Sequence, residues 1–338
     1  MSVLADIRVD EAIKAFNVTG GRLRISVTPA CQLKCIFCHT EGNPDHGTRK
    51  FMDPEVFVAL LDAFEALCGT EVHVTGGEPL LHPRILGMLD SVGHHRPFRV
   101  TLSTNGLALT RLIKAGRLFN IDQFKISMHT LRDDEEAHRL VGKAWHFGRL
   151  RSNIQGVRSL GYRVILNYVL TQRNLELLPL VLDEAVALGT DLKVIDLETT
   201  SHTPQHATHR GLTYFATDSV TIQEAIELIS GRAELVEVVQ GVSGSSLLRY
   251  REGESLFTVK NPGLGSFETG MCVGCPYKSY CAEGVFALRV NANGTYKPCL
   301  LRDDYNTQDA PYTSASSKEG VVNAMSQAIA VMMTGATG

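Results

Sequence analysis

Three cysteines near the start of this chain restrict its possible folds more than any other feature of the sequence. Cys31, Cys35 and Cys38 have the spacing C-x3-C-x2-C. Thiolates this close together can bind three irons of one 4Fe–4S cube, because cysteine thiolate is the usual ligand of such clusters. The fourth iron then has no protein ligand, and an open coordination position on a metal is where chemistry takes place. Zinc is the alternative, although zinc sites usually pair C-x2-C with a second pair of ligands.

The stretch from Cys31 to Cys38 resembles the cluster loop of the radical SAM enzymes. In that family the open iron binds S-adenosylmethionine (SAM), and the reduced cluster cleaves SAM to a deoxyadenosyl radical that removes a hydrogen atom from the substrate. The resemblance implies that Phe37 lies against the adenine of SAM. It also implies a reductase or a flavodoxin-type protein as the electron donor.

Composition and charge narrow the class of protein further. The chain has 338 residues, of which 44% are hydrophobic and 20% charged, and this suits a globular protein with one large domain and a smaller one. Lys and Arg number 33 against 36 Asp and Glu, with no basic tract, so we expect neither nucleic acid nor a membrane as a partner. Residues 1–16 lack the apolar middle of a secretory signal. We therefore expect a cytoplasmic protein, and its eight cysteines are better interpreted as a set that supplies metal ligands than as disulfide partners.

Strand and helix patterns alternate about six times over the first two hundred residues. The expected strands are 23–27, 72–75, 98–103, 124–128, 163–170 and 192–197, and the expected helices include 54–68, 83–92, 149–160 and 175–188. This rhythm predicts an α/β fold with a parallel sheet, and with the family resemblance it predicts a partial (β/α)6 radical SAM barrel. Functional residues then lie where the strands' carboxyl ends meet the following loops. Cys68, on the apolar side of its helix, is expected to be a buried thiol.

A polar segment at 201–217 is the expected boundary between two domains. It separates a barrel at residues 1–200 from a small C-terminal auxiliary iron–sulfur domain at 218–338. In the second domain we expect a helix at 222–229, β-rich stretches at 233–239, 246–250 and 255–260, and a last helix at 321–333. The boundary contains His202, His206 and His209, an alternative metal site, although such a polar loop is usually only solvated.

The second strand ends in Gly76-Gly77-Glu78-Pro79. Glycine lets a backbone approach a ligand closely, and Glu78 could accept a hydrogen bond from a cationic group. Alone this stretch reads as a tight turn. Beside the cysteine loop it resembles the glycine-rich motif of the family, which holds the ammonium of the methionine part of SAM.

Two further strand ends carry short polar side chains. Thr104 and Asn105 follow the third strand, and Ser127 with His129 closes the fourth. They resemble family positions that contact the ribose and the carboxylate of SAM, since hydroxyl and amide groups can bond sugar oxygens. His129 is a candidate for substrate contact instead.

Four cysteines near the C-terminus form a second group, Cys272, Cys275, Cys281 and Cys299. Four thiolates suit zinc as well as a 4Fe–4S cluster. Beside a radical SAM loop the auxiliary cluster is the favoured interpretation.

The sequences at 288–294 and 297–300 resemble one subfamily, the GTP 3',8-cyclases of molybdenum cofactor biosynthesis. Those enzymes leave one iron of the second cluster open for guanine, whereas Cys281 is a candidate fourth ligand here. The cyclase's terminal glycine pair is also absent from residues 334–338.

The basic residues of the cyclase are only partly present. Arg24 and Arg289 match two of them and Lys193 replaces an arginine, but Ile165 and Ala287 stand where the cyclase has a lysine and an arginine. A triphosphate needs several cationic donors.

We therefore expect a radical SAM enzyme, of lyase or cyclase type, that modifies a small anionic nucleotide or sugar nucleoside, by cyclisation or decarboxylation as in nucleoside-antibiotic biosynthesis. Arg24, Lys193 and Arg289 would hold its phosphate or carboxylate, and Asn167 would bond substrate or cofactor. The alternatives are the GTP cyclase itself, a peptide-modifying maturase, for which residues 1–20 offer too short a peptide-binding segment, and an iron–sulfur carrier or sensor, which has no need of the turn at Glu78.

Overall fold

The computed structural model describes residues 2–42, 50–93, 96–198, 217–240, 244–306 and 317–335. Its strands are β1 (Arg22–Ser26), β2 (Glu71–Thr75), β3 (Arg99–Thr104), β4 (Gln123–Ser127), β5 (Arg163–Val169), β6 (Asp191–Ile195), β7 (Glu234–Val239), β8 (Leu247–Glu252), β9 (Ser255–Lys260), β10 (Leu288–Val290) and β11 (Tyr296–Lys297). Its α-helices are α1 (Ser2–Val18), α2 (Pro54–Ala66), α3 (Ile85–Ser91), α4 (Thr110–Ile113), α5 (Glu135–Val141), α6 (Phe147–Ser159), α7 (Leu178–Ala187), α9 (Ile222–Ser230) and α10 (Lys318–Thr334). Short 3-10 turns include η1 (Thr40–Gly42) and η2 (Pro79–Leu81).

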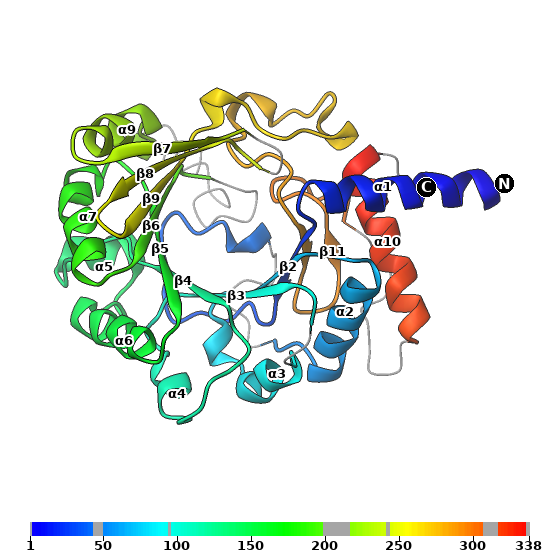
Figure 1. Ribbon diagram of the computed structural model, residues 1–338, viewed down its shortest axis with the longest axis horizontal. Coiled ribbons are helices and arrows are strands. Elements are labelled where there is room, and N and C mark those ends of the chain that lie inside the picture. The colour runs from blue at the N-terminus through cyan, green and yellow to red at the C-terminus, as the bar shows by residue number, and fades with distance from the viewer. Residues whose placement is uncertain are drawn as a thin grey trace.

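The described strands form one sheet in the order β11-β10-β1-β2-β3-β4-β5-β6-β9-β8-β7. Strands β1 to β6 are all parallel to their neighbours, which confirms the predicted α/β fold with a parallel sheet. In Figure 1 strands β2 to β6 follow an arc, and helices α2 to α7 lie outside it. This is the arrangement of a partial barrel, in which the carboxyl ends of the strands share one rim.

The C-terminal residues extend this sheet at both edges. Strand β10 pairs in parallel with β1, and β9 pairs in parallel with β6. The side chains at 260, 283 and 289 therefore reach the same rim as the N-terminal strands. The proposed division into two domains stays a prediction, because nearly all of its boundary lies outside the described residues. The candidate metal ligands His202, His206 and His209 lie outside them too.

Strand β5 separates a buried side from a cavity-facing side. In β5 the side chains of Val164, Leu166 and Tyr168 are buried, and Asn167 with Val169 lines the central cavity. This alternation follows from the two-residue period of a strand. Within the described part of the chain, no helix has the length and apolar character needed to cross a membrane.

Helix α2 shows how local chemistry sets the helix ends. The side chain of Asp53 accepts a hydrogen bond from the Glu55 N–H at 3.0 Å, as an N-cap should. The chain leaves the helix through Cys68, which has φ +57° and an exposed side chain. The prediction that Cys68 is buried was wrong, because this residue makes the left-handed turn and so points away from the apolar face of the helix.

Asn174 fastens the carboxyl ends of β4 and β5 together. Its Nδ2 donates to the carbonyl oxygens of His129 at 3.0 Å and Val169 at 2.9 Å, and its Oδ1 accepts from the Thr171 N–H at 2.8 Å. The side chain is fully buried.

Replacing Asn174 by Ala leaves these buried backbone groups without partners, so we expect the free energy of unfolding to fall by about 3 kcal/mol. Anaerobic urea titration measures the change. Asn293→Ala is the matched control, because its Oδ1 caps only an exposed turn at Thr295, and it should cost less than about 1 kcal/mol. Equal losses for the two variants would contradict this account of Asn174.

Candidate active site

A cavity of about 320 Å³ lies at the rim formed by the strands' carboxyl ends. It brings together most of the residues that the sequence analysis selected. Those that line it are Arg24, Cys31, Cys35, Phe37, Cys38, Gly76, Gly77, Thr104, Asn105, Ser127, His129, Asn167, Lys193 and Arg289. Glu78 and Pro79 do not line it, and the four C-terminal cysteines line a second cavity.

The cysteine loop is fixed by backbone contacts to α5. The N–H groups of Lys34 and Ile36 donate to the carbonyl oxygens of Val141 at 3.1 Å and Leu140 at 3.0 Å. Gly142 ends α5 with φ +101°, and a Cβ there would lie 2.8 Å from the Lys34 nitrogen. Glycine is therefore required where the helix end meets the loop.

Burial keeps the three thiols protonated in the absence of a metal. It raises the pKa of Cys31 to about 12 and that of Cys38 to about 11, and it raises the pKa of Cys35 well above its usual value. Metal binding must release these protons, because the thiolate is the ligand.

The two glycines after β2 bring that turn against the start of the cysteine loop. The Gly77 N–H donates to the Thr28 carbonyl at 2.7 Å, and the Glu78 N–H donates to the Ala30 carbonyl at 2.7 Å. A Cβ on Gly76 would lie 2.3 Å from the Thr28 oxygen, and one on Gly77 would lie 2.5 Å from the Ala30 oxygen. Besides any contact with a cofactor, these glycines therefore allow the loop to pack.

Glu78 is fully buried and joins the ends of β2 and β3. Its Oε1 accepts from the Leu80 N–H at 3.0 Å and from Thr104 Oγ1 at 2.8 Å, and its Oε2 accepts from the Asn105 N–H at 2.7 Å. Burial raises the pKa of this carboxyl to about 7. The expected contact between Glu78 and an ammonium group stays a prediction, whereas its role in holding the two strand ends is visible here.

His129 lies beside Phe37, with ring centroids 4.7 Å apart in an edge-on arrangement. The Val169 N–H donates to His129 Nδ1 at 3.1 Å. Burial lowers the pKa of His129 to about 3, so the ring is neutral near pH 7 and its proton lies on Nε2. His129 can therefore offer one N–H donor beside the aromatic ring.

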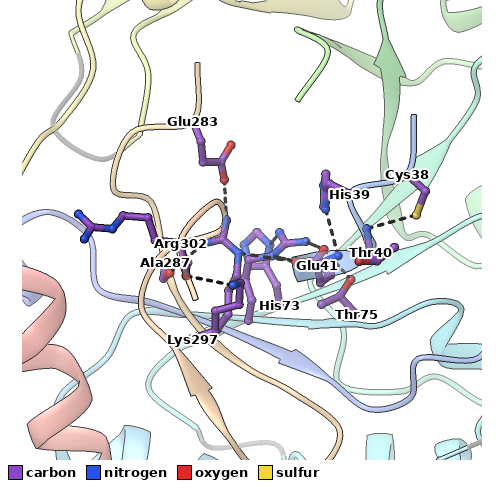
Figure 2. Close-up of polar contacts among 12 residues, drawn as sticks. Cys38, His39, Thr40, Glu41, His73, Thr75, Glu283, Ala287, Lys297 and Arg302 are labelled. Atoms are coloured by element: carbon purple, nitrogen blue, oxygen red, sulfur yellow. Dashed lines mark hydrogen bonds and ion pairs between the residues drawn. The ribbon is translucent and has the colours of Figure 1, made fainter. Parts of the chain in front are cut away.

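Arg24 forms the centre of one polar network. Its guanidinium donates to both carboxylate oxygens of Glu41, and Nη1 donates to His73 Nδ1 at 3.2 Å. Since an arginine can only donate, the proton of His73 lies on Nε2 and points to Glu71 at 2.7 Å. Figure 2 shows Glu41 between His39 and Thr75, at the end of the cysteine loop. The nearby arginine holds the pKa of Glu41, despite burial, at about 2.

Glu283 forms the centre of a second network. Its two oxygens accept from Arg289 Nη2 at 2.6 Å and from Lys260 Nζ at 2.9 Å. Lys260 also lies 3.6 Å from Glu198 Oε1. Despite its burial, the neighbouring cations hold the pKa of Glu283 well below its usual range. Figure 2 shows Glu283 on the C-terminal segment, with its carboxylate pointing toward the group of side chains that includes Glu41 and His73.

Lys125 and Lys193 are the remaining lysines of the cavity. Burial lowers the pKa of Lys125 to about 7 and that of Lys193 to about 8. Lys125 Nζ lies 4.0 Å from Glu71, whereas no carboxylate of the described residues lies within ion-pair distance of Lys193.

Sequence reasoning missed several polar residues of this cavity, in particular Glu41, Lys125, Lys260 and Glu283. One of them, Lys125, had a usable signal. Lys125 lies two residues before Ser127 on one strand, so both side chains share the cavity face. Glu283 and Lys260 gave no such signal, since their meeting depends on the pairing of β9 with β6.

The second cavity, of about 440 Å³, is lined by Cys272, Cys275, Cys281 and Cys299. Four thiols around one cavity are a donor set that fits an iron–sulfur cluster. In the described part of the chain, no three His, Cys, Asp or Glu side chains converge at the distances of a single metal ion. Which cysteines ligate an auxiliary cluster stays a prediction.

Residues 25–182 match the radical SAM superfamily. This stretch contains the cysteine loop, the glycine turn, the end of β1 and strands β2 to β5, so these residues are a radical SAM domain, and the expectation of an enzyme is confirmed. The expected cofactors, SAM and 4Fe–4S clusters, are confirmed at the level of the family. The residues assigned to them remain predictions.

Curated relatives of this chain point to one group within the superfamily, the GTP 3',8-cyclases. The chain is 24% identical over 283 residues to a probable GTP 3',8-cyclase of Methanococcus maripaludis, with 83% of this chain and 85% of that protein covered. It is 26% identical over 231 residues to a GTP 3',8-cyclase of Marinobacter nauticus, covering 68% of this chain and 67% of that one. Both relatives confirm the resemblance to the cyclase group.

A solved structure supports the fold. The crystal structure of Streptococcus suis SuiB bound to S-adenosylmethionine superposes with a TM-score of 0.57 at 16% identity. The match covers 86% of this chain and 63% of that longer chain. At this identity the likeness shows the architecture alone, and it confirms the predicted barrel.

Replacing Gly77 by Ala should displace the cysteine loop, because the new Cβ would lie 2.5 Å from the Ala30 backbone oxygen. We expect the iron content of the anaerobically purified protein to fall by about half, since one of two clusters is lost. Gly87→Ala is the control, because a Cβ there meets nothing within 4 Å. Full iron content in the Gly77 variant would contradict the packing argument.

His129 should make stability depend on pH. The folded protein holds this ring neutral down to about pH 3, whereas the unfolded chain protonates it below about 6.5. The unfolded state thus binds the extra proton, and stability falls as the pH drops below about 6.5, by up to about 1.4 kcal/mol per pH unit.

Asn in place of His129 can keep the hydrogen bond from Val169 and removes the titrating group. Urea titrations between about pH 7 and 5.5 should therefore show a shallower loss of stability in this variant. Parallel curves for wild type and variant would contradict the assignment.

Proposed function

We propose that this chain uses SAM and a reduced 4Fe–4S cluster to modify a small anionic nucleotide or nucleoside. The observation that carries the proposal is one cavity with three cysteines, an aromatic ring and a glycine turn at one side, and basic side chains at the other. When bound, the cofactor supplies a radical that removes a hydrogen atom from a substrate held nearby. The protein's own part is to hold the substrate in place and to exclude water.

Several side chains are available for that task. Lys193 offers a cation, and Arg24 and Arg289 offer partly committed guanidinium groups, all of which suit a phosphate or carboxylate. Asn167 Oδ1 is buried, and no described residue donates a hydrogen bond to it. A hydroxyl or N–H of the substrate is therefore the partner that it needs. His129 Nε2–H can donate to an oxygen near the aromatic ring.

The electron donor stays part of the proposal. A reductase or a flavodoxin-type protein would reduce the cluster, as the resemblance implies. The C-terminal cysteines are proposed to hold the auxiliary cluster, with Cys281 as the fourth ligand beside Cys272, Cys275 and Cys299, since all four line one cavity.

A GTP 3',8-cyclase is the second candidate, and the names of both curated relatives favour it. Against a triphosphate site stand Ile165 and Ala287 at two positions where the cyclase has basic residues. The carboxylates of Glu41 and Glu283 on the cavity's arginines weigh in the same direction.

Anaerobic turnover tests the proposal. Reduced enzyme with SAM should release deoxyadenosine at least about 10-fold faster when the correct nucleotide or nucleoside is present, because productive binding places a hydrogen within reach. Chromatography of deoxyadenosine and of each candidate substrate gives the readout, and Cys35→Ala is the inactive control. A cyclised product from GTP would select the second candidate. No response to any nucleotide or nucleoside would overturn the proposed substrate class.

A further inference from the structure

We propose that the cavity selects a substrate with one anionic group, a phosphate monoester or a carboxylate, and rejects a triphosphate, and that Glu283 sets this limit. The inference rests on the proposed function and specifies its substrate class. It follows from how the carboxylates of the cavity are distributed among its cations.

Most cations that could hold phosphates already have a carboxylate partner. Glu283 uses one oxygen on Arg289 and the other on Lys260. Glu41 uses both oxygens on Arg24. These side chains are at most 18% exposed, so water screens the pairs only weakly. An incoming phosphate on these cations would have to displace a carboxylate or lie against it.

Lys193 is the cation left for the substrate. No carboxylate of the described residues lies within ion-pair distance of it, and its Nζ lies 6.0 Å from the centre of the Phe286 ring. It pairs in register with Asn167 on β5, which in turn pairs with Ser127 on β4. All three line the cavity. This row offers one cation, one amide and one hydroxyl, a set that suits a single anionic group.

The net charge of the side chains that line the cavity also suits a substrate with a single anionic group. Its lining contains six Lys and Arg side chains and four Asp and Glu side chains, an excess of two positive charges. Burial raises the pKa of Glu198 to about 7 and that of Asp196 to about 6, which adds to the excess, and it lowers the pKa of Lys125 to about 7, which subtracts from it. A phosphate monoester carries about −1.5 to −2 near pH 7, and a triphosphate carries roughly −4. The monoester matches the excess and the triphosphate exceeds it.

Glu283 belongs to the segment that separates the two cavities. Cys281 and Val285 of this segment line the cavity of the four cysteines, and Glu283 lines the other. The Val285 N–H donates to the Phe267 carbonyl, and the Val285 carbonyl accepts from the Gly244 N–H, both at 2.8 Å. These bonds fix the backbone two residues after Glu283, and the ion pairs with Arg289 and Lys260 hold its carboxylate in the cavity.

The test compares substrates that differ only in their anionic group. Calorimetry on the anaerobic holoenzyme with SAM would measure the binding of the mono-, di- and triphosphates of guanosine and uridine, and of a uridine 5'-carboxylate. The cluster and SAM are the same in every arm, so their charges cancel in the comparison. We expect the monophosphate or the carboxylate to bind about 10-fold or more tighter than the triphosphate of the same nucleoside. The stronger of these two arms identifies the anionic group.

Glu283→Gln removes the charge while keeping the shape of the side chain, and should improve triphosphate binding relative to monophosphate by about 10-fold. Glu198→Gln, in the same cavity, should shift the ratio the same way by less, and gives a second reading should the Glu283 variant fold poorly. Glu254→Gln, an exposed carboxylate on the β8–β9 turn, is the control with equal charge change. Iron content and thermal unfolding report whether each variant is intact.

Two outcomes overturn the inference. One is a wild type that binds a triphosphate as tightly as its monophosphate, which would leave a nucleotide-modifying enzyme in place. The other is an unchanged ratio in intact Glu283 and Glu198 variants. If no nucleotide or nucleoside binds in any arm, the proposed function fails together with the inference, and that result is distinct from the other two.

Discussion

The contact between the turn after β2 and the start of the cysteine loop underlies the rest of the site. Two hydrogen bonds of 2.7 Å join the Gly77 N–H to Thr28 and the Glu78 N–H to Ala30. A side chain on Gly76 or Gly77 would collide with the carbonyl oxygens that accept these bonds. Glu78 then continues the connection to the end of β3 through Thr104 and Asn105. Three strand ends are thus held in one arrangement before any cofactor binds.

Backbone hydrogen bonds therefore hold the side of the cavity that is expected to bind the cofactor. Ion pairs between buried charged side chains hold the other side. Along β1, Arg24 lies two residues before Ser26 and faces the carboxylate of Glu41 at the end of the cysteine loop. The C-terminal strands bring Lys260 and Arg289 to the same space through their pairing with β6 and β1. The first side accounts for the likeness to the superfamily, and the second side is where this chain can differ from its relatives.

Much of the fold was predictable because strands and helices have different hydrophobic periods. The six barrel strands and the helices expected at 54–68, 83–92, 149–160 and 175–188 lie within a few residues of their expected bounds, whereas α4 and α5 were not expected. The cysteine spacing identified the rim of the sheet. Cys68 was predicted wrongly, since the apolar period runs one residue past the point where the chain turns. The glycines were expected to approach a ligand, and sequence alone could not show that they also approach Thr28 and Ala30. Glu283 could not be paired with Lys260 and Arg289, because that contact depends on which strand edges meet.

The central claim is that Cys31, Cys35 and Cys38 hold a 4Fe–4S cluster whose free iron binds SAM. Electron paramagnetic resonance of the reduced, anaerobically purified protein tests it most directly, with and without SAM, in the wild type and in a variant whose four C-terminal cysteines are replaced by alanine. The account predicts an iron–sulfur signal in both proteins that changes on addition of SAM. Zinc in place of iron at the three N-terminal thiols, or a cluster signal that SAM leaves unaltered, would contradict it.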